Sequence, residues 1–442
     1  MKKEDENRLD RRDKIIDAAV FTLLLLVVSA VTLVLFYRQT LADPEVSYKS
    51  DMKAYILEMQ GLDSGYSFPY PVFFKTAALF HLFTSPELAV ALATMLLNSL
   101  GILFVKLALN RIVLQSCENG RELPEKNWLT GTVLSVLAVS LFFISMLYPP
   151  PGIYLPGIRF KYVGVFSANP FHNATYMAAR PFAVLAFLWY VKLLPVYERG
   201  VQMRNSGKSD GEGPALYDYV LFSVFLLTAT MTKPSFTIVL VGAAGIVMLY
   251  RLLRSGFRNL APAIQLGLCF VPTFIDLLYQ YRGVFMGSGE VEGGIGFTFG
   301  EIWGYYCDSI PLSICLAIGF PLLVLLLNFR ELRQDTLFRF SWQMYLVSLC
   351  MAFFLYEKGF RKPDFNFSWG YMYGIFFCHL SALTVLLKAT MRVQRNRDMV
   401  LEKGIRRNFP RMLICAQWIA YLCHVVCGLG YFITIWRGEI YY

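Results

Sequence analysis

Charged residues, histidines and metal-binding cysteine patterns are all scarce in this chain of 442 residues. Asp, Glu, Lys and Arg together make up 16% of it, against roughly 25% in an ordinary soluble domain. The four histidines lie far apart, and no Cys-x-x-Cys or His-x-x-x-His spacing occurs, so no metal site is indicated. Most of the nine cysteines fall inside apolar runs, which excludes a disulfide framework. No internal repeat and no separate polar domain is seen, so residues 1 to 442 are expected to form one transmembrane domain.

Apolar residues, by contrast, are abundant. The chain is 56% hydrophobic, with a mean hydropathy of +0.48, which predicts an all-α integral membrane protein. The net charge of +10 needs no nucleic-acid partner, because membrane proteins keep Lys and Arg in their cytoplasmic loops. Membrane lipids are the partners that this composition implies.

The apolar runs predict about eleven transmembrane helices, since a span needs about 20 mostly apolar residues. The fifth, sixth and ninth of these runs are short. The runs lie near 15 to 36, 86 to 108, 129 to 148, 176 to 196, 217 to 231, 235 to 250, 261 to 279, 308 to 328, 341 to 356, 370 to 388 and 412 to 436.

The distribution of Lys and Arg predicts a cytoplasmic N-terminus and an outside C-terminus, because this orientation puts better than two basic residues inside for each one outside. The first run is interpreted as a retained signal anchor, since its apolar core is longer than that of a cleaved signal peptide. Four outside segments follow, and long loops of this kind tend to carry function. They are residues 37 to 85, 149 to 175, 280 to 307 and 357 to 369, whereas the connection at Lys233-Pro234 is minimal.

The first outside segment contains "SDMKAYILEMQG", residues 50 to 61. Asp51, Tyr55 and Glu58 recur at helical spacing, which predicts a short amphipathic helix over residues 51 to 60 at the outer interface. The simplest role for Asp51 is that of an acid in the first turn, with Ser50 as the cap. A carboxylate at a helix N-terminus also stays ionised, so it could accept a proton in a partly dry cleft.

A second interfacial helix is predicted after this one, in "YSFPYPVFFKTAALFHLF". Its apolar run of about 12 residues is too short to span a bilayer, so it suits a helix lying along the membrane. Lys75 and His81 would then reach the headgroups, either as snorkelling side chains or as ligands. Tyr66 and Tyr70 stand at its start, where aromatic rings could stack on a sugar or simply form part of the interfacial belt.

This arrangement resembles the GT-C superfamily of membrane glycosyltransferases. The similarity covers about the first 110 residues: a cytoplasmic N-terminus, one signal anchor, an outside Asp shortly after it, and a Tyr-Pro-rich interfacial stretch before the second span. The resemblance implies a polyprenyl-phosphate-linked sugar as donor, Asp51 as the catalytic base and Asp63 as its substitute. It also implies an acceptor that is a glycan, a lipid or a protein. Met52 and Lys53 follow Asp51 where some relatives carry a second acid, so no metal is assigned, and a divalent metal stays an open alternative.

A lipid-phosphate donor requires cations at the outer headgroup level. Two groups of residues qualify, with lipid-headgroup contact as the alternative for both. The first is Lys358, Arg361 and Lys362 beside Glu357, and the second is Arg159, Lys161, His172 and Arg180. The predicted contacts to the sugar or acceptor come from Tyr55, Tyr66, Tyr70, His81, His172 and Glu357.

The expected function is therefore transfer of a sugar at the outer face of a bacterial plasma membrane, with inversion, for assembly of a cell-envelope glycan. A polysaccharide polymerase or ligase and a transporter or flippase of lipid-linked saccharide are the alternatives. Asn173 and Asn366 also match the N-glycosylation sequon, a pattern that is common by chance.

Overall fold

The computed structural model describes residues 2–118, 128–148, 160–205, 214–285, 294–399 and 408–439. Within these ranges, seven helices are long and apolar enough to cross a membrane. They are α1 (Lys2–Leu41), α4 (Pro86–Glu118), α6 (Ala174–Asn205), α8 (Ser235–Arg254), α15 (Thr336–Phe354), α16 (Ser368–Met399) and α17 (Asn408–Trp436).

Two further pairs of helices could each form one broken span. The pair α9 (Leu260–Leu268) and α10 (Val271–Phe285) is bent by 53°, and the pair α12 (Ile310–Ala317) and α13 (Gly319–Leu327) by 71°. Pro272 and Pro321 stand just after the two breaks and lack the amide hydrogen that would continue the helical hydrogen bonds. With these pairs, the described part of the chain has up to nine candidate spans.

The described residues thus show up to nine candidate spans where about eleven were predicted. The helices α5 (Trp128–Ser140) and α7 (Leu216–Thr232) are apolar but shorter than a span. The third predicted run, 129 to 148, stops being helical after Ser140 because its backbone bonds elsewhere: the Asn169 side-chain amide donates to the carbonyls of Leu141 and Ile144. By contrast, the sixth and ninth runs, predicted to be short, are the full-length helices α8 and α15.

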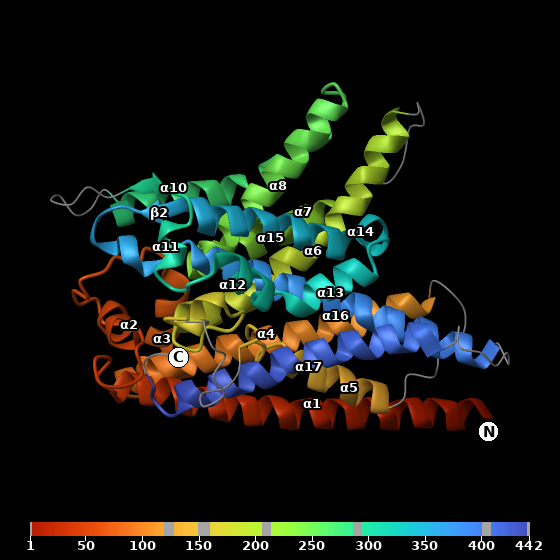
Figure 1. Cartoon of the computed structure of the whole chain (residues 1–442), viewed down its shortest axis with the longest axis horizontal. Helices are drawn as coiled ribbons and strands as arrows, with labels where there is room; N and C mark the ends of the chain where they lie inside the picture. The colour runs from red at the N-terminus through yellow and green to blue at the C-terminus, as the bar shows by residue number, and fades with distance from the viewer. Residues whose placement is uncertain are drawn as a thin grey trace.

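Short elements gather at one end of the bundle (Figure 1). The C-terminus lies at this end and the N-terminus at the other, as expected for a chain whose termini face opposite sides of a membrane. The predicted outside segments meet here too, although 149–159 and 286–293 lie beyond the described residues. The short elements are α2 (Met52–Met59), α3 (Pro71–His81), η1 (Val163–Phe166), β1 (Ile295–Phe297), α11 (Glu301–Gly304), β2 (Leu355–Glu357) and η2 (Gly359–Asp364); α14 (Glu331–Gln334) lies near the other end.

The helix α16 forms the centre of the bundle, with nearly every side chain from Tyr371 to Leu386 buried. It packs against α15, α8, α13 and α17. Gly374 allows α15 to come close, since a Cβ there would lie 2.2 Å from the Ser348 hydroxyl. Strands β1 and β2 pair antiparallel, with Gly296 opposite Tyr356, and join the third and fourth outside segments.

A buried ion pair fastens α1 to α4 and α5. The Lys106 ammonium lies 2.8 Å from the Asp17 carboxylate and donates to the Gly131 carbonyl at 2.8 Å. Gly131 is required here, because a Cβ at this position would lie 2.5 Å from the Asp17 side chain. Lys106 lies near the end of the predicted run 86 to 108, and the structure buries it with 3% of its surface exposed.

Candidate functional site

Asp51 occupies the N-cap position of α2, but its side chain does not cap that helix. The Asp51 carboxylate Oδ2 instead accepts hydrogen bonds from the Tyr55 hydroxyl at 3.1 Å and from the Asn173 amide at 3.0 Å. The prediction of Ser50 as the cap is wrong, because α2 begins one residue later than that interpretation requires. The predicted helix itself is confirmed, and it ends before Gly61, whose φ of +72° favours glycine.

Asn173 organises the site. It precedes α6, and its Oδ1 accepts the backbone N–H of Tyr176 at 2.9 Å, which is a helix N-cap bond. The same oxygen accepts bonds from the Thr175 hydroxyl at 3.0 Å and the Lys233 ammonium at 3.3 Å. The Asn173 amide nitrogen faces the other way, toward Asp51 and Tyr55. Because Asn173 is 1% exposed and its nitrogen is bonded inward, this sequon is no glycan attachment point in the folded chain.

Lys233 supplies a buried positive charge between α7 and α8. Its ammonium donates to the Thr175 hydroxyl at 3.0 Å and lies 4.7 Å from the centre of the Trp369 ring. Among the described residues, no carboxylate lies within ion-pair distance of it. Burial is the main cause that lowers the pKa of Lys233 to about 8. The positive charge of nearby Arg361 also lowers this pKa, whereas the negative charges of Asp51 and Glu357 raise it.

His172 borders this cluster as a neutral ring. Burial, together with Lys233 and Lys49, lowers the pKa of His172 to about 3. Its Nδ1 is hydrogen-bonded to the Tyr162 hydroxyl, which in turn lies 3.1 Å from the Tyr431 hydroxyl. The His172 ring also lies against Trp369, with 5.4 Å between ring centres. The structure therefore places His172 beside Lys233 as a neutral, packed ring, and not as the cation that was predicted for it.

The predicted residues of the first outside segment divide into two groups. Tyr55 is buried against Asp51, and Tyr70 lies close enough to Asp51 and Arg361 for both to affect the pKa of its hydroxyl, which burial raises. Asp63 is exposed and accepts the Gly65 amide at 2.8 Å, so it stabilises a turn. The remaining two residues are also exposed: Tyr66 packs against Phe68, and the His81 ring meets the Thr84 carbonyl.

The cations predicted at 357 to 369 are largely engaged by acids. Arg361 lies 3.4 Å from Glu357 and 3.6 Å from Asp364. Lys362 is 2.7 Å from Glu301, whereas Lys358 is exposed. Glu357 also accepts the Asn366 amide at 2.8 Å, so the second sequon is bonded inward as well.

The second predicted group of cations is separated by the fold, and one of its members, Arg159, lies outside the described residues. Lys161 is exposed over the Tyr306 ring, at 5.5 Å. Arg180 is completely buried, donates to the Ala168 carbonyl at 2.8 Å and is enclosed by aromatic rings, the nearest that of Phe142 at 5.0 Å. Two of its nitrogens have no partner among the described residues. Arg180 thus lies within the bundle, and a phosphate could reach it only if the surrounding helices moved.

Sequence reasoning did not assign Asn173, Thr175 or Lys233 to the site. A signal for Asn173 was present, because Asn before a helix is a preferred N-cap. Lys233, a lone cation between two apolar runs, was counted only as a connection. Within the described ranges, no group of three His, Cys, Asp or Glu residues could hold a metal ion.

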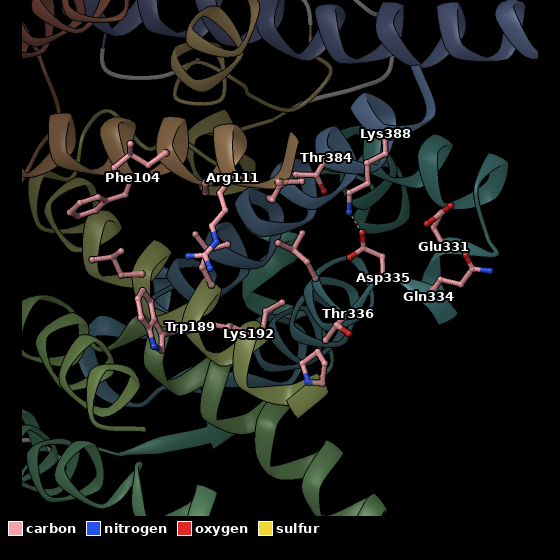
Figure 2. Close-up of a pocket in the computed structure, with 18 of the residues that line it drawn as sticks. Phe104, Arg111, Trp189, Lys192, Glu331, Gln334, Asp335, Thr336, Thr384 and Lys388 are labelled. Carbon is pink, nitrogen blue, oxygen red and sulfur yellow. Dashed lines mark hydrogen bonds and ion pairs between the residues drawn. The ribbon is translucent and has the colours of Figure 1, made fainter. Parts of the chain in front are cut away.

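A cavity of about 890 Å³ lies away from this site, toward the end of the bundle that carries α14. It is formed by α4, α6, α14, α15 and α16, and Figure 2 shows the polar side chains that line it. Comparison of the chain with known protein families, curated proteins and solved structures gives no match.

Proposed function

We propose that this protein is a membrane glycosyltransferase of the GT-C type, which moves a sugar from a polyprenyl-phosphate carrier to an acceptor hydroxyl at the end of the bundle where Asp51 lies. One observation carries the proposal: the two ends of the Asn173 amide hold an exposed carboxylate and a buried ammonium. Sugar transfer from a lipid phosphate needs a base for the acceptor and a cation for the leaving phosphate.

Asp51 is suited to the role of base. Its Oδ2 is held by Asn173 and Tyr55, whereas Oδ1 has no hydrogen bond to any described residue. Because the residue is exposed, an acceptor hydroxyl could approach Oδ1. In the proposed step, Asp51 takes the hydroxyl proton while the acceptor oxygen forms a bond to the anomeric carbon. The bond from that carbon to the phosphate oxygen breaks, and attack from the opposite face inverts the configuration.

Lys233 is suited to the leaving phosphate. Among the described residues, the buried ammonium bonds only to a neutral amide and a hydroxyl, so it keeps a charge that an anion would stabilise. Arg361 lies near enough to affect the pKa of Lys233, which makes it a second cation on the same side. Arg361 is shared between Glu357 and Asp364, so we assign the main role to Lys233 and a supporting role to Arg361.

The test is sugar transfer by the purified full-length protein from a polyprenyl-phosphate sugar. Asp51→Asn keeps the shape of the side chain and removes the base, so we expect a loss of about 10²-fold or more in turnover, the usual effect of a general base. Asp43→Asn is the matched control, because Asp43 is an exposed acid in a turn at the same end. Full activity of Asp51→Asn would remove it from the mechanism, and loss in Asp63→Asn alone would move the role to Asp63. Transport of the lipid-linked sugar without transfer, equal in wild type and Asp51→Asn, would contradict the proposal.

A further inference from the structure

The cavity between α4, α6, α15 and α16 combines apolar walls with a cluster of charges (Figure 2). Its apolar lining includes Phe104, Leu107, Leu185, Leu188 and Leu337. Its charged lining has four cations, Arg111, Lys192, Lys388 and Arg392, and two acids, Glu331 and Asp335. Such a lining suits a ligand with an apolar body and an anionic head.

Each acid of the cavity already binds a cation. Lys388 lies 2.6 Å from Asp335, and Arg392 lies 2.5 Å from Glu331. A third cation, Lys192, is paired with Asp218 of α7 at 2.6 Å. These three pairs are satisfied without a ligand, so they leave no carboxylate in the lining to balance a further positive charge.

Arg111 is that further charge. It projects from α4 into the cavity, toward Trp189 and Lys192, in Figure 2. Its side chain makes no hydrogen bond or ion pair with any residue that the structure describes. A guanidinium offers five N–H donors in a planar fork that matches the oxygens of a phosphate. An uncommitted arginine in an otherwise paired site therefore points to an anionic ligand.

The position of the cavity near a membrane surface indicates which anionic ligands could reach it. Arg111 is next to the last residue of the candidate span Pro86–Ile112, so it lies near one membrane surface. The count of Lys and Arg predicts that this surface is cytoplasmic. Basic pockets between transmembrane helices on the cytoplasmic side suit the phosphate heads of anionic lipids.

We propose that this cavity binds a phosphate monoester through Arg111, with the apolar walls holding the acyl chains of an anionic lipid that carries it. The same headgroup chemistry could come from a soluble phosphate, and the experiment separates these two sources. The proposal does not depend on sugar transfer at Asp51, because the two sites share no residue.

The experiment titrates detergent-solubilised full-length protein with phosphatidic acid brominated in its acyl chains. Bromine quenches nearby tryptophans, and Trp189, which lines the cavity, gives the signal that is lost in Trp189→Phe. We expect saturable quenching by this lipid and affinity reduced about tenfold or more in Arg111→Gln, as for loss of a charge-assisted pair. Arg258→Gln is the matched control, because it removes an exposed arginine outside the cavity lining.

The outcomes distinguish a lipid from a soluble phosphate as the ligand, and they show whether the proposal fails. Binding that glycerol 3-phosphate does not displace supports the lipid, and displacement by millimolar glycerol 3-phosphate supports a soluble phosphate at the same Arg111. Equal quenching by brominated phosphatidylcholine would overturn the proposal, as would equal losses in Arg111→Gln and Arg258→Gln. Arg111 has no partner among the described residues, so we expect Arg111→Gln to fold, and an unchanged melting temperature will show it.

Discussion

Asn173 donates its side-chain amide to the Asp51 carboxylate at 3.0 Å, across 122 residues of sequence. This bond joins the cap of α6 to the start of α2 and turns the carboxylate away from its own helix. Helix α2 and the bundle therefore meet at a polar cluster in which Tyr55 and Thr175 also take part, and the first prediction depends on this cluster.

Asn173→Asp is expected to shift the acid limb of the activity profile to higher pH. The change replaces a donor by a second carboxylate about 3 Å from Asp51, and like charges this close share one proton. Below the raised pKa we expect turnover to fall about tenfold for each pH unit, since the ionised fraction of the base falls by that factor. The measurement is the pH dependence of sugar transfer. Asn366→Asp places the same charge beside Glu357, and its acid limb should stay in place.

Lys233→Met is expected to remove a pH dependence of stability in the alkaline range. The pKa of Lys233 is about 8 in the folded protein, below its ordinary value of 10.5, because burial disfavours the ammonium. Between these two values the unfolded chain binds more protons than the folded one, so the free energy of unfolding rises with pH. Below about pH 8 both states are protonated and this contribution is constant.

The measurement is the melting temperature of wild type minus that of Lys233→Met, from pH 7 to pH 10. Other titrating groups cancel in this difference, which we expect to increase with pH. A flat difference would show that Lys233 is not held as a buried ammonium.

Lys106→Met is expected to destabilise the bundle by about 3–5 kcal/mol, the usual cost of leaving half of a buried ion pair. The change leaves Asp17 charged and unpaired and removes the donor to the Gly131 carbonyl. Thermal unfolding in detergent measures it. The double variant Asp17→Asn with Lys106→Met removes both charges, and it should recover much of the loss. Equal melting temperatures for wild type and the single variant would show that the pair contributes nothing.

Gly428→Ala is expected to disturb the packing of α17. A Cβ at position 428 would lie 1.4 Å from the Phe143 carbonyl oxygen, and backbone atoms cannot move aside as a side-chain tip can. We expect a loss of about 3 kcal/mol or more, at the upper end for overpacked sites. The control is Gly245→Ala in α8, where nothing lies within 4 Å of the new Cβ. Similar melting temperatures for the two variants would contradict this packing.

The contacts near Gly428 also explain a buried histidine. His424 accepts the Phe320 amide at 3.1 Å on Nε2, and its Nδ1 lies 2.7 Å from the Ser145 carbonyl oxygen. These two bonds require a neutral ring with the proton on Nδ1. The imidazole thus satisfies backbone groups at the break between α12 and α13, which a low-dielectric interior would otherwise leave unpaired.

Composition and apolar runs by themselves determined that this chain is an all-α multi-pass membrane protein, because a bilayer requires long apolar helices whatever their order. Local spacing also determined the short helix after Asp51 and the second short helix that follows it. These properties depend on residues that are close together in the chain, so they can be predicted from the sequence alone.

Only the tertiary structure decided which polar groups meet. It brought Asn173 and Lys233 to Asp51, buried Arg180 among aromatic rings, and left Arg111 uncommitted in a cavity that no local pattern indicates. It also ended the third predicted run at Ser140, where the Asn169 amide bonds to backbone carbonyls that a longer helix would use. The physical reason is the same in each case: a polar group inside a bundle takes its partner from another helix, and the choice of partner follows from how all the helices pack together.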